Sequence, residues 1–204
     1  MIPEERLSTT LVYDNLLLPN PQPSELVSRE LGGVALNDPS QGLAVKVWTC
    51  TTVVSANPLV PDQIVVFADD VPQASLFSAF GVSEVSLAFD QNMRPFVAFV
   101  TQGNAKFYWY DSLLEEAVIS DLPSGSTSPR CTLDDHRARQ TGNSDIIMVY
   151  IHDGNFCFRA ERDRYEIEYV LIEDVNLQII SPTIQWVAFN LNYRLQFSLR
   201  GNFN

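Results

Sequence analysis

The amino-acid sequence predicts an all-β protein built from antiparallel, blade-like repeats, arranged as a partial β-propeller or a sandwich-like array, with an extended N-terminal arm. Three observations predict this class. One β-type pattern occurs twice between residues 86 and 159. Apolar and polar residues alternate with period two in most segments after residue 42, as in half-buried strands. Helical composition is minimal: residues 112–118 suit one or two turns, and residues 24–31 suit a short turn.

The repeated pattern reads strand, acidic turn, strand, Gly-Asn turn, strand. The first copy occupies residues 86–90, 95–100 and 103–110, and the second occupies residues 131–135, 146–151 and 154–159. The copies are about 45–50 residues apart, which is typical of propeller blades and related β arrays. Because such a unit cannot bury its apolar face alone, we expect it to stack against neighbouring units of this chain or of another.

The two copies also predict a shared apolar core, since strand residues two apart point to the same face of a sheet. The expected core residues are Phe89, Val97, Phe99, Phe107 and Trp109, with counterparts Leu133, Ile147, Val149, Phe156 and Phe158.

The N-terminal segment, residues 1–42, differs from the rest of the chain. Five prolines interrupt any continuous helix or ladder there, because proline lacks the N–H donor. The segment nevertheless carries the apolar run Leu16, Leu17 and Leu18, which is costly to leave in water. We interpret it as a docking arm that packs on a neighbouring surface, beside a β-repeat domain of residues 43–204. The alternative is a strand and loops wrapped on its own domain.

The remaining elements are expected as strands. Residues 43–54, 63–68 and 74–77 are rich in β-branched and apolar residues, and they resemble a first, degenerate copy of the repeat. Residues 165–171 alternate as a half-buried strand would. The C-terminal strands are expected at residues 177–180, 183–189 and 193–200.

The turns between these strands have suitable residues. Asp90 begins an expected Asx turn, while Gly103, Asp153 and Gly154 tolerate the positive φ of tight hairpins.

Composition narrows the classes of function. The formal net charge of −12 disfavours broad binding to nucleic-acid phosphates. No run approaches the length of a membrane span, and the N-terminus lacks the pattern of a signal peptide, so we expect synthesis in a cytosol. Cys50, Cys131 and Cys157 have no metal-ligand spacing and are expected to be reduced core residues.

Catalytic chemistry has little support in the sequence. Asp134, Asp135 and His136 resemble a ligand cluster, but consecutive strand residues alternate faces, and Asp135 matches Asp90 in the repeat. We therefore interpret these residues as a turn. Other acidic residues are numerous without a spacing that pairs them: Glu84, Glu161, Asp163, Glu166 and Glu168. The sequence predicts no enzyme, no cofactor, and no catalytic or metal-binding residue.

Two aromatic residues are candidates for an interaction surface. In the strand that holds Phe107 and Trp109, Tyr108 and Tyr110 point to the opposite face. Tyrosine is enriched at interfaces, and aromatic rings also serve as platforms for sugars. The possible interface residues are thus Leu16, Leu17, Leu18, Tyr108 and Tyr110.

Several segments resemble tail proteins of double-stranded DNA bacteriophages. The resemblance covers about residues 30–200 and is carried by residues 87–99, 106–111, 129–135, 144–150, 159–169 and 193–200. It implies a virion structural protein, in a connector, nozzle or tail-tip region, that is made in the host cytoplasm. It implies no catalytic residue.

The sequence thus predicts a non-enzymatic tail subunit that assembles with copies of itself or with other phage tail proteins. Only two or three blade equivalents fit in the chain, whereas a closed propeller has at least four. The alternative is a carbohydrate-binding module at the tail tip, which would attach to a host-surface glycan through Tyr108 and Tyr110.

Overall fold

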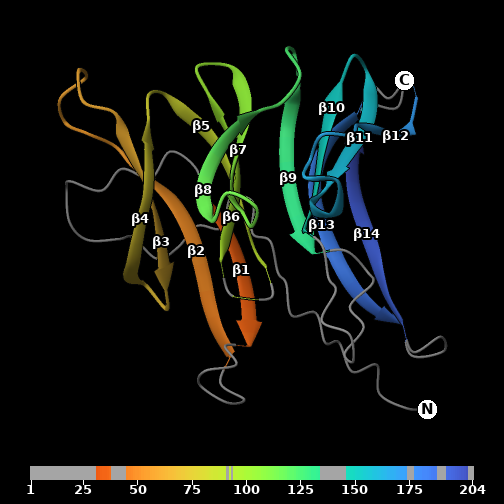
Figure 1. The fold of residues 1–204 in the computed structure, drawn as a ribbon, viewed down its shortest axis with the longest axis horizontal. Helices are drawn as coiled ribbons and strands as arrows, with labels where there is room; N and C mark the ends of the chain where they lie inside the picture. The colour runs from red at the N-terminus through yellow and green to blue at the C-terminus, as the bar shows by residue number, and fades with distance from the viewer. Residues whose placement is uncertain are drawn as a thin grey trace.

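The computed structural model of the chain describes residues 31–37, 45–90, 92, 94–133, 146–173, 177–187 and 192–201. The described residues form an all-β fold, as predicted, in which three four-stranded sheets and one two-stranded sheet are stacked (Figure 1). Every strand pairs antiparallel with its neighbours.

Each four-stranded sheet is an up-and-down meander, which we call a blade. Blade 1 contains β1 (Leu31–Asn37), β2 (Val45–Val53), β3 (Asp62–Ala68) and β4 (Val71–Ala79). Blade 2 contains β5 (Val82–Phe89), β6 (Pro95–Thr101), β7 (Asn104–Asp111) and β8 (Glu116–Asp121). Blade 3 contains β9 (Thr127–Leu133), β10 (Ile146–His152), β11 (Asn155–Ala160) and β12 (Tyr169–Ile172).

The last sheet, β13 (Leu177–Val187) and β14 (Asn192–Gly201), has only two strands. The first strand of each sheet contacts the first strand of the next: β1 lies against β5, β5 against β9, and β9 against β13. Stacking through successive first strands is the arrangement of propeller blades, so the described chain forms three blades and half of a fourth.

Blade 2 is buried on both faces. Its face toward blade 1 contributes Val97 and Phe99 to one apolar cluster, in which Phe99 packs against Phe77 of β4 with ring centroids 4.6 Å apart. Its face toward blade 3 contributes Phe96, Phe107 and other residues to a second cluster. The central strand β6 is therefore buried from Phe96 to Val100 without interruption.

The two predicted copies of the repeat are blades 2 and 3, and their side chains face the same way. Val97 and Phe99 point back toward blade 1, and Met148 and Tyr150, at the same positions of the next copy, point back toward blade 2. The expected pairing of Val97 and Phe99 with Ile147 and Val149 is thus wrong by one residue. Those two residues belong to a third cluster, on the opposite face of blade 3.

The predicted turns are confirmed. Gln102 and Gly103 join β6 to β7, and Asp153 and Gly154 join β10 to β11, all with φ between 49° and 78°. Two consecutive residues of positive φ give the hairpin twist that matches the twist of the flanking strands. The carboxylate of Asp90 accepts hydrogen bonds from the backbone N–H groups of Asn92 and Arg94, both at 2.8 Å.

Residues 31–37 of the predicted arm form β1, which pairs with β2 inside blade 1. The first copy of the repeat therefore begins earlier than the sequence pattern indicated. Residues 1–30, including Leu16, Leu17 and Leu18, lie outside the described residues, so their docking remains a prediction.

Two predicted elements differ in the structure. Residues 112–115 form a turn rather than a helix, because the carboxylate of Asp111 accepts the N–H groups of Leu113 and Leu114, and β8 follows immediately. The predicted strand 165–171 is reduced to β12, whose four residues are all exposed. Tyr165 has a φ of 59°, which is incompatible with a continuing strand.

Replacement of Phe99 tests the packing of blade 1 on blade 2. Phe99→Ala should lower the free energy of unfolding by about 3–5 kcal/mol, because the side chain is only 1% exposed. Phe158→Ala should cost less, since Phe158 is half-buried. Urea denaturation measures both, with the exposed Ile119→Ala as a control expected within about 0.5 kcal/mol of the parent. A loss below about 1 kcal/mol for Phe99→Ala would contradict face-to-face packing.

Candidate functional site

The junction between blades 2 and 3 holds a cluster of aromatic rings together with Glu84 and Glu161, two of the acidic residues that the sequence analysis considered. At its centre, the ring of Tyr165 lies 5.1–5.2 Å from the rings of Phe96, Phe107 and Trp109. Tyr165 reaches this position because it follows the 3-10 turn Glu161–Asp163 with a positive φ. The turn therefore carries an aromatic ring of blade 3 into the core of blade 2.

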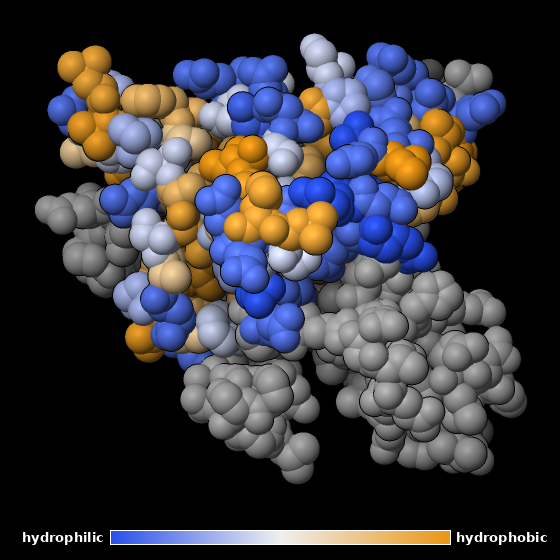
Figure 2. All heavy atoms as spheres, in the orientation of Figure 1, coloured by the Kyte–Doolittle hydropathy of each residue, from blue (hydrophilic) through white to orange (hydrophobic). Residues whose placement is uncertain are grey.

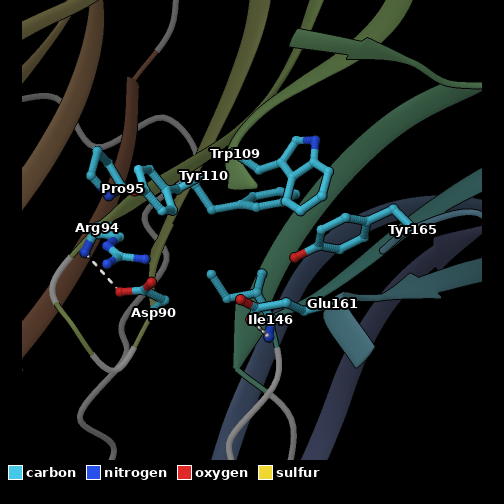
Figure 3. Close-up of a pocket in the computed structure, with 9 residues that line it drawn as sticks. Asp90, Arg94, Pro95, Trp109, Tyr110, Ile146, Glu161 and Tyr165 are labelled. Carbon is cyan, nitrogen blue, oxygen red and sulfur yellow. Dashed lines mark hydrogen bonds between the residues drawn. The ribbon is translucent and has the colours of Figure 1, made fainter. Parts of the chain in front are cut away.

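A small cavity opens beside this cluster (Figure 3). Figure 3 shows Trp109 and Tyr165 on one side, Arg94 and Asp90 on the other, and Glu161 below. The cavity volume is about 10 Å³, close to the least that holds one water molecule. It is too small for a sugar ring or a cofactor.

The polar groups around this cavity have structural partners. Asp90 accepts the two backbone hydrogen bonds of its Asx turn, and Glu161 accepts the N–H of Ile146 at 3.1 Å. The guanidinium of Arg94 lies 3.8 Å from the centroid of the Tyr110 ring, a cation–π contact. Each carboxylate thus holds a loop in place.

Two ion pairs fasten blade 3 to blade 2. Arg130 on β9 donates to the carboxylate of Glu84 on β5 at 2.8 Å, and Arg130 is only 5% exposed. At another point of the junction, Arg164 pairs with the buried Asp111. Sequence reasoning placed Glu84 among unpaired carboxylates and missed both contacts. The partners are 46 and 53 residues apart, so no local signal indicates them.

Within blade 3, a buried polar network surrounds Tyr150. The Tyr150 hydroxyl donates to Glu168 at 2.6 Å and accepts from Nε of Arg159 at 3.0 Å. Nδ1 of His152 lies 3.0 Å from the same Glu168 carboxylate. Burial, together with the hydrogen bond to Glu168, raises the pKa of Tyr150, so the phenol stays protonated.

Glu168 itself is stabilised as the anion. Burial acts to raise the pKa of its carboxyl group, but the hydrogen bonds from Tyr150 and His152 outweigh burial, and the pKa lies below its ordinary value of 4.5. The network links β10 and β11 to the segment before β12.

The predicted interface tyrosines lie on the blade 1 side of β7. Tyr108 is half-buried and stacks on Phe77 at 5.2 Å between centroids. Tyr110 is half-buried beneath Arg94. One face of each ring is therefore already in contact within the chain, and their roles at an interface or with a glycan remain predictions. Asp134, Asp135 and His136 lie outside the described residues.

All three cysteines are free and buried. Burial raises the pKa of Cys131 to about 12 and that of Cys50 further, so neither thiol is activated as a nucleophile. Sγ of Cys131 instead donates to the carbonyl oxygen of Ser86 at 3.1 Å, which adds a contact between β9 and β5.

Removal of Glu84 tests the inter-blade ion pair. Glu84→Ala should lower the free energy of unfolding by about 2–3 kcal/mol, because it leaves the buried Arg130 guanidinium without its carboxylate. Asp121→Ala is the matched control, since Asp121 pairs with Lys106 at 2.7 Å but is 73% exposed. It should cost at most about 1 kcal/mol. Equal losses for the two variants in urea denaturation would contradict the assignment.

Glu168 makes stability dependent on pH. Because the pKa of Glu168 is lowered on folding, its contribution is fully present above pH 4.5 and is lost as the pH falls through the lower, folded value. The stability advantage of the parent over Glu168→Gln should therefore shrink as unfolding is measured from about pH 6 down to about pH 3. Glu166→Gln, at an exposed carboxylate, is the matched control. An advantage that stays constant with pH would overturn the assignment.

Among the described residues, no group of three or more histidine, cysteine, aspartate or glutamate side chains is placed to hold a metal ion. Within the same residues, no helix has the length and apolar character needed to cross a membrane. Comparison of the chain with known protein families, with curated proteins and with solved structures gives no match.

Proposed function

We propose that the chain is a non-enzymatic structural subunit in the tail of a double-stranded DNA bacteriophage, made in the host cytoplasm and built into the virion with copies of itself or other tail proteins. The observation that carries the proposal is the stack of antiparallel sheets, whose outer strands β4, β8 and β12 each pair on one side only within the described residues. The resemblance of about residues 30–200 to phage tail proteins supports the tail as its place.

The open strand edges of the described blades favour assembly on physical grounds. A closed propeller has at least four blades and protects its sheet edges by closure. The three and a half blades of the described residues present strand edges that another polypeptide can pair or cover. The geometry of the junction between blades 2 and 3 favours a structural role as well, because its carboxylates are used in turns and ion pairs.

The N-terminal segment is the proposed docking arm. Packing of Leu16, Leu17 and Leu18 on a neighbouring subunit would contribute about 1.5–3 kcal/mol for each buried side chain, less the entropy of ordering the backbone. Since β1 begins at Leu31, the arm proper is the segment before it.

Deletion of residues 1–30 tests the arm. The truncated chain keeps all of β1 and should fold with an unchanged circular dichroism spectrum, but it should form smaller assemblies by light scattering and enter tail particles poorly. Full-length chain carrying Ile119→Ala is the control for an unrelated surface change. Unfolding of the truncated chain would mean that the segment belongs to the core of its own domain. Normal assembly would refute docking by the arm.

A further inference from the structure

The outer edge of blade 3 is formed by an apolar strand. Its last strand, β12, pairs with β11 on one side, and no other described strand pairs with its second edge. The side chains of Tyr169, Val170, Leu171 and Ile172 are each 37–51% exposed, and Ile167 just before them is 49% exposed. Figure 2 shows apolar atoms gathered at this side of the molecule, over blade 3.

The outer strands of the other two blades contain residues that protect an edge. β4 contains Pro72, and β8 begins with Glu116 and ends with Asp121, which pairs with Lys106. Proline and edge charges hinder addition of a further strand. The pairing of β12 with β11 shifts register once, as the pairing of β4 with β3 does twice, but the four residues of β12 include neither proline nor a charged residue. The absence of proline and charge within β12 favours strand addition there.

Charge at the two ends of β12 indicates the chemistry of the added strand. Glu166 precedes the strand and Glu173 follows it, and both are exposed. The whole chain carries a net charge of −12, so an approaching basic segment is attracted over a longer range as well. An apolar segment with lysine or arginine at both ends complements this edge.

The same charges disfavour a second copy of β12 as the occupant. Antiparallel pairing of two β12 strands that keeps their four apolar residues opposite one another places Glu168 of one copy opposite Glu173 of the other. Like charges directly opposite each other destabilise a strand pair. The four-residue edge is also short for a stable dimer, which needs roughly 1,000 Å² or more of buried surface.

We propose that β12 is a docking edge for an extended segment of another polypeptide, apolar at its centre and basic at both ends, which adds as a fifth strand to blade 3. Main-chain hydrogen bonds give affinity in this mode, and the side chains on either side give specificity. The inference names a partner chemistry for the assembly role and rests on that proposed function.

Binding of a synthetic peptide to the full chain tests the proposal. The probe is a fluorescent ten-residue peptide of alternating valine and threonine with two lysines at each end, and a second peptide has glutamates in place of the lysines. Fluorescence anisotropy should detect binding of the lysine peptide and at least about tenfold weaker binding of the glutamate peptide. Hydrogen exchange should show new protection of amides in residues 169–172.

Three variants locate the site. Leu171→Lys should abolish binding of the lysine peptide, while Ile119→Lys on β8, at a residue of nearly equal exposure, should leave it unchanged. The double variant Glu166→Lys with Glu173→Lys should reverse the preference between the two peptides. Each variant's circular dichroism spectrum verifies its fold.

Several outcomes would overturn the proposal. These are absence of lysine-peptide binding to the parent, equal binding of the two peptides, or equal effects of Leu171→Lys and Ile119→Lys. A concentration-dependent dimer that Leu171→Lys abolishes would replace the proposed partner with a second copy. None of these outcomes bears on deletion of residues 1–30, so failure of this inference and failure of the docking arm are distinguishable.

Discussion

The fold depends on one constraint, which is that a blade with two apolar faces needs a neighbour on each. In β6 the side chains from Phe96 to Val100 are all buried, although they alternate between the two faces. One face is covered by blade 1 and the other by blade 3. Blade 2 cannot fold as an isolated sheet without exposing both of these faces, so the stack forms through mutual burial of neighbouring sheets.

Apolar contact alone does not fix the position of one blade relative to the next, because it has little directional preference. At the junction of blades 2 and 3, ion pairs fix the relative position of the two sheets. Glu84 with Arg130 joins the first strands of the two blades, and Asp111 with Arg164 joins the end of β7 to the turn before β12. Two fixed points separated along the junction restrict rotation of one sheet on the other.

Much of the fold was predictable from the sequence. The strands of the repeat show alternating apolar and polar residues, and its turns contain residues that tolerate positive φ. Gly103 and Gly154 identified hairpins correctly for this reason. β1 was anticipated only in the alternative of a strand wrapped on its own domain, because its seven residues include two glycines and follow a proline-rich stretch. The turn after Asp111 was predicted as a helix. The hydrogen bond from the Leu113 N–H to the Asp111 carboxylate, which forms the turn, does not affect the spacing of apolar residues on which the prediction depended. The ion pairs of the site were unpredictable, since each joins residues far apart in sequence.

The linear stacking of the blades has a consequence for how the molecule opens. Loss of blade 2 breaks two sheet-to-sheet contacts, whereas loss of a terminal sheet breaks one among the described blades. The stability of such an array is approximately the sum of the folding free energy of each repeat and the interaction free energy between adjacent repeats. Among the described sheets, local stability therefore rises from both ends toward blades 2 and 3, and the terminal sheets rearrange at the lowest free-energy cost. Conformational adjustment is thus concentrated at the ends of the stack, while its centre keeps a fixed shape.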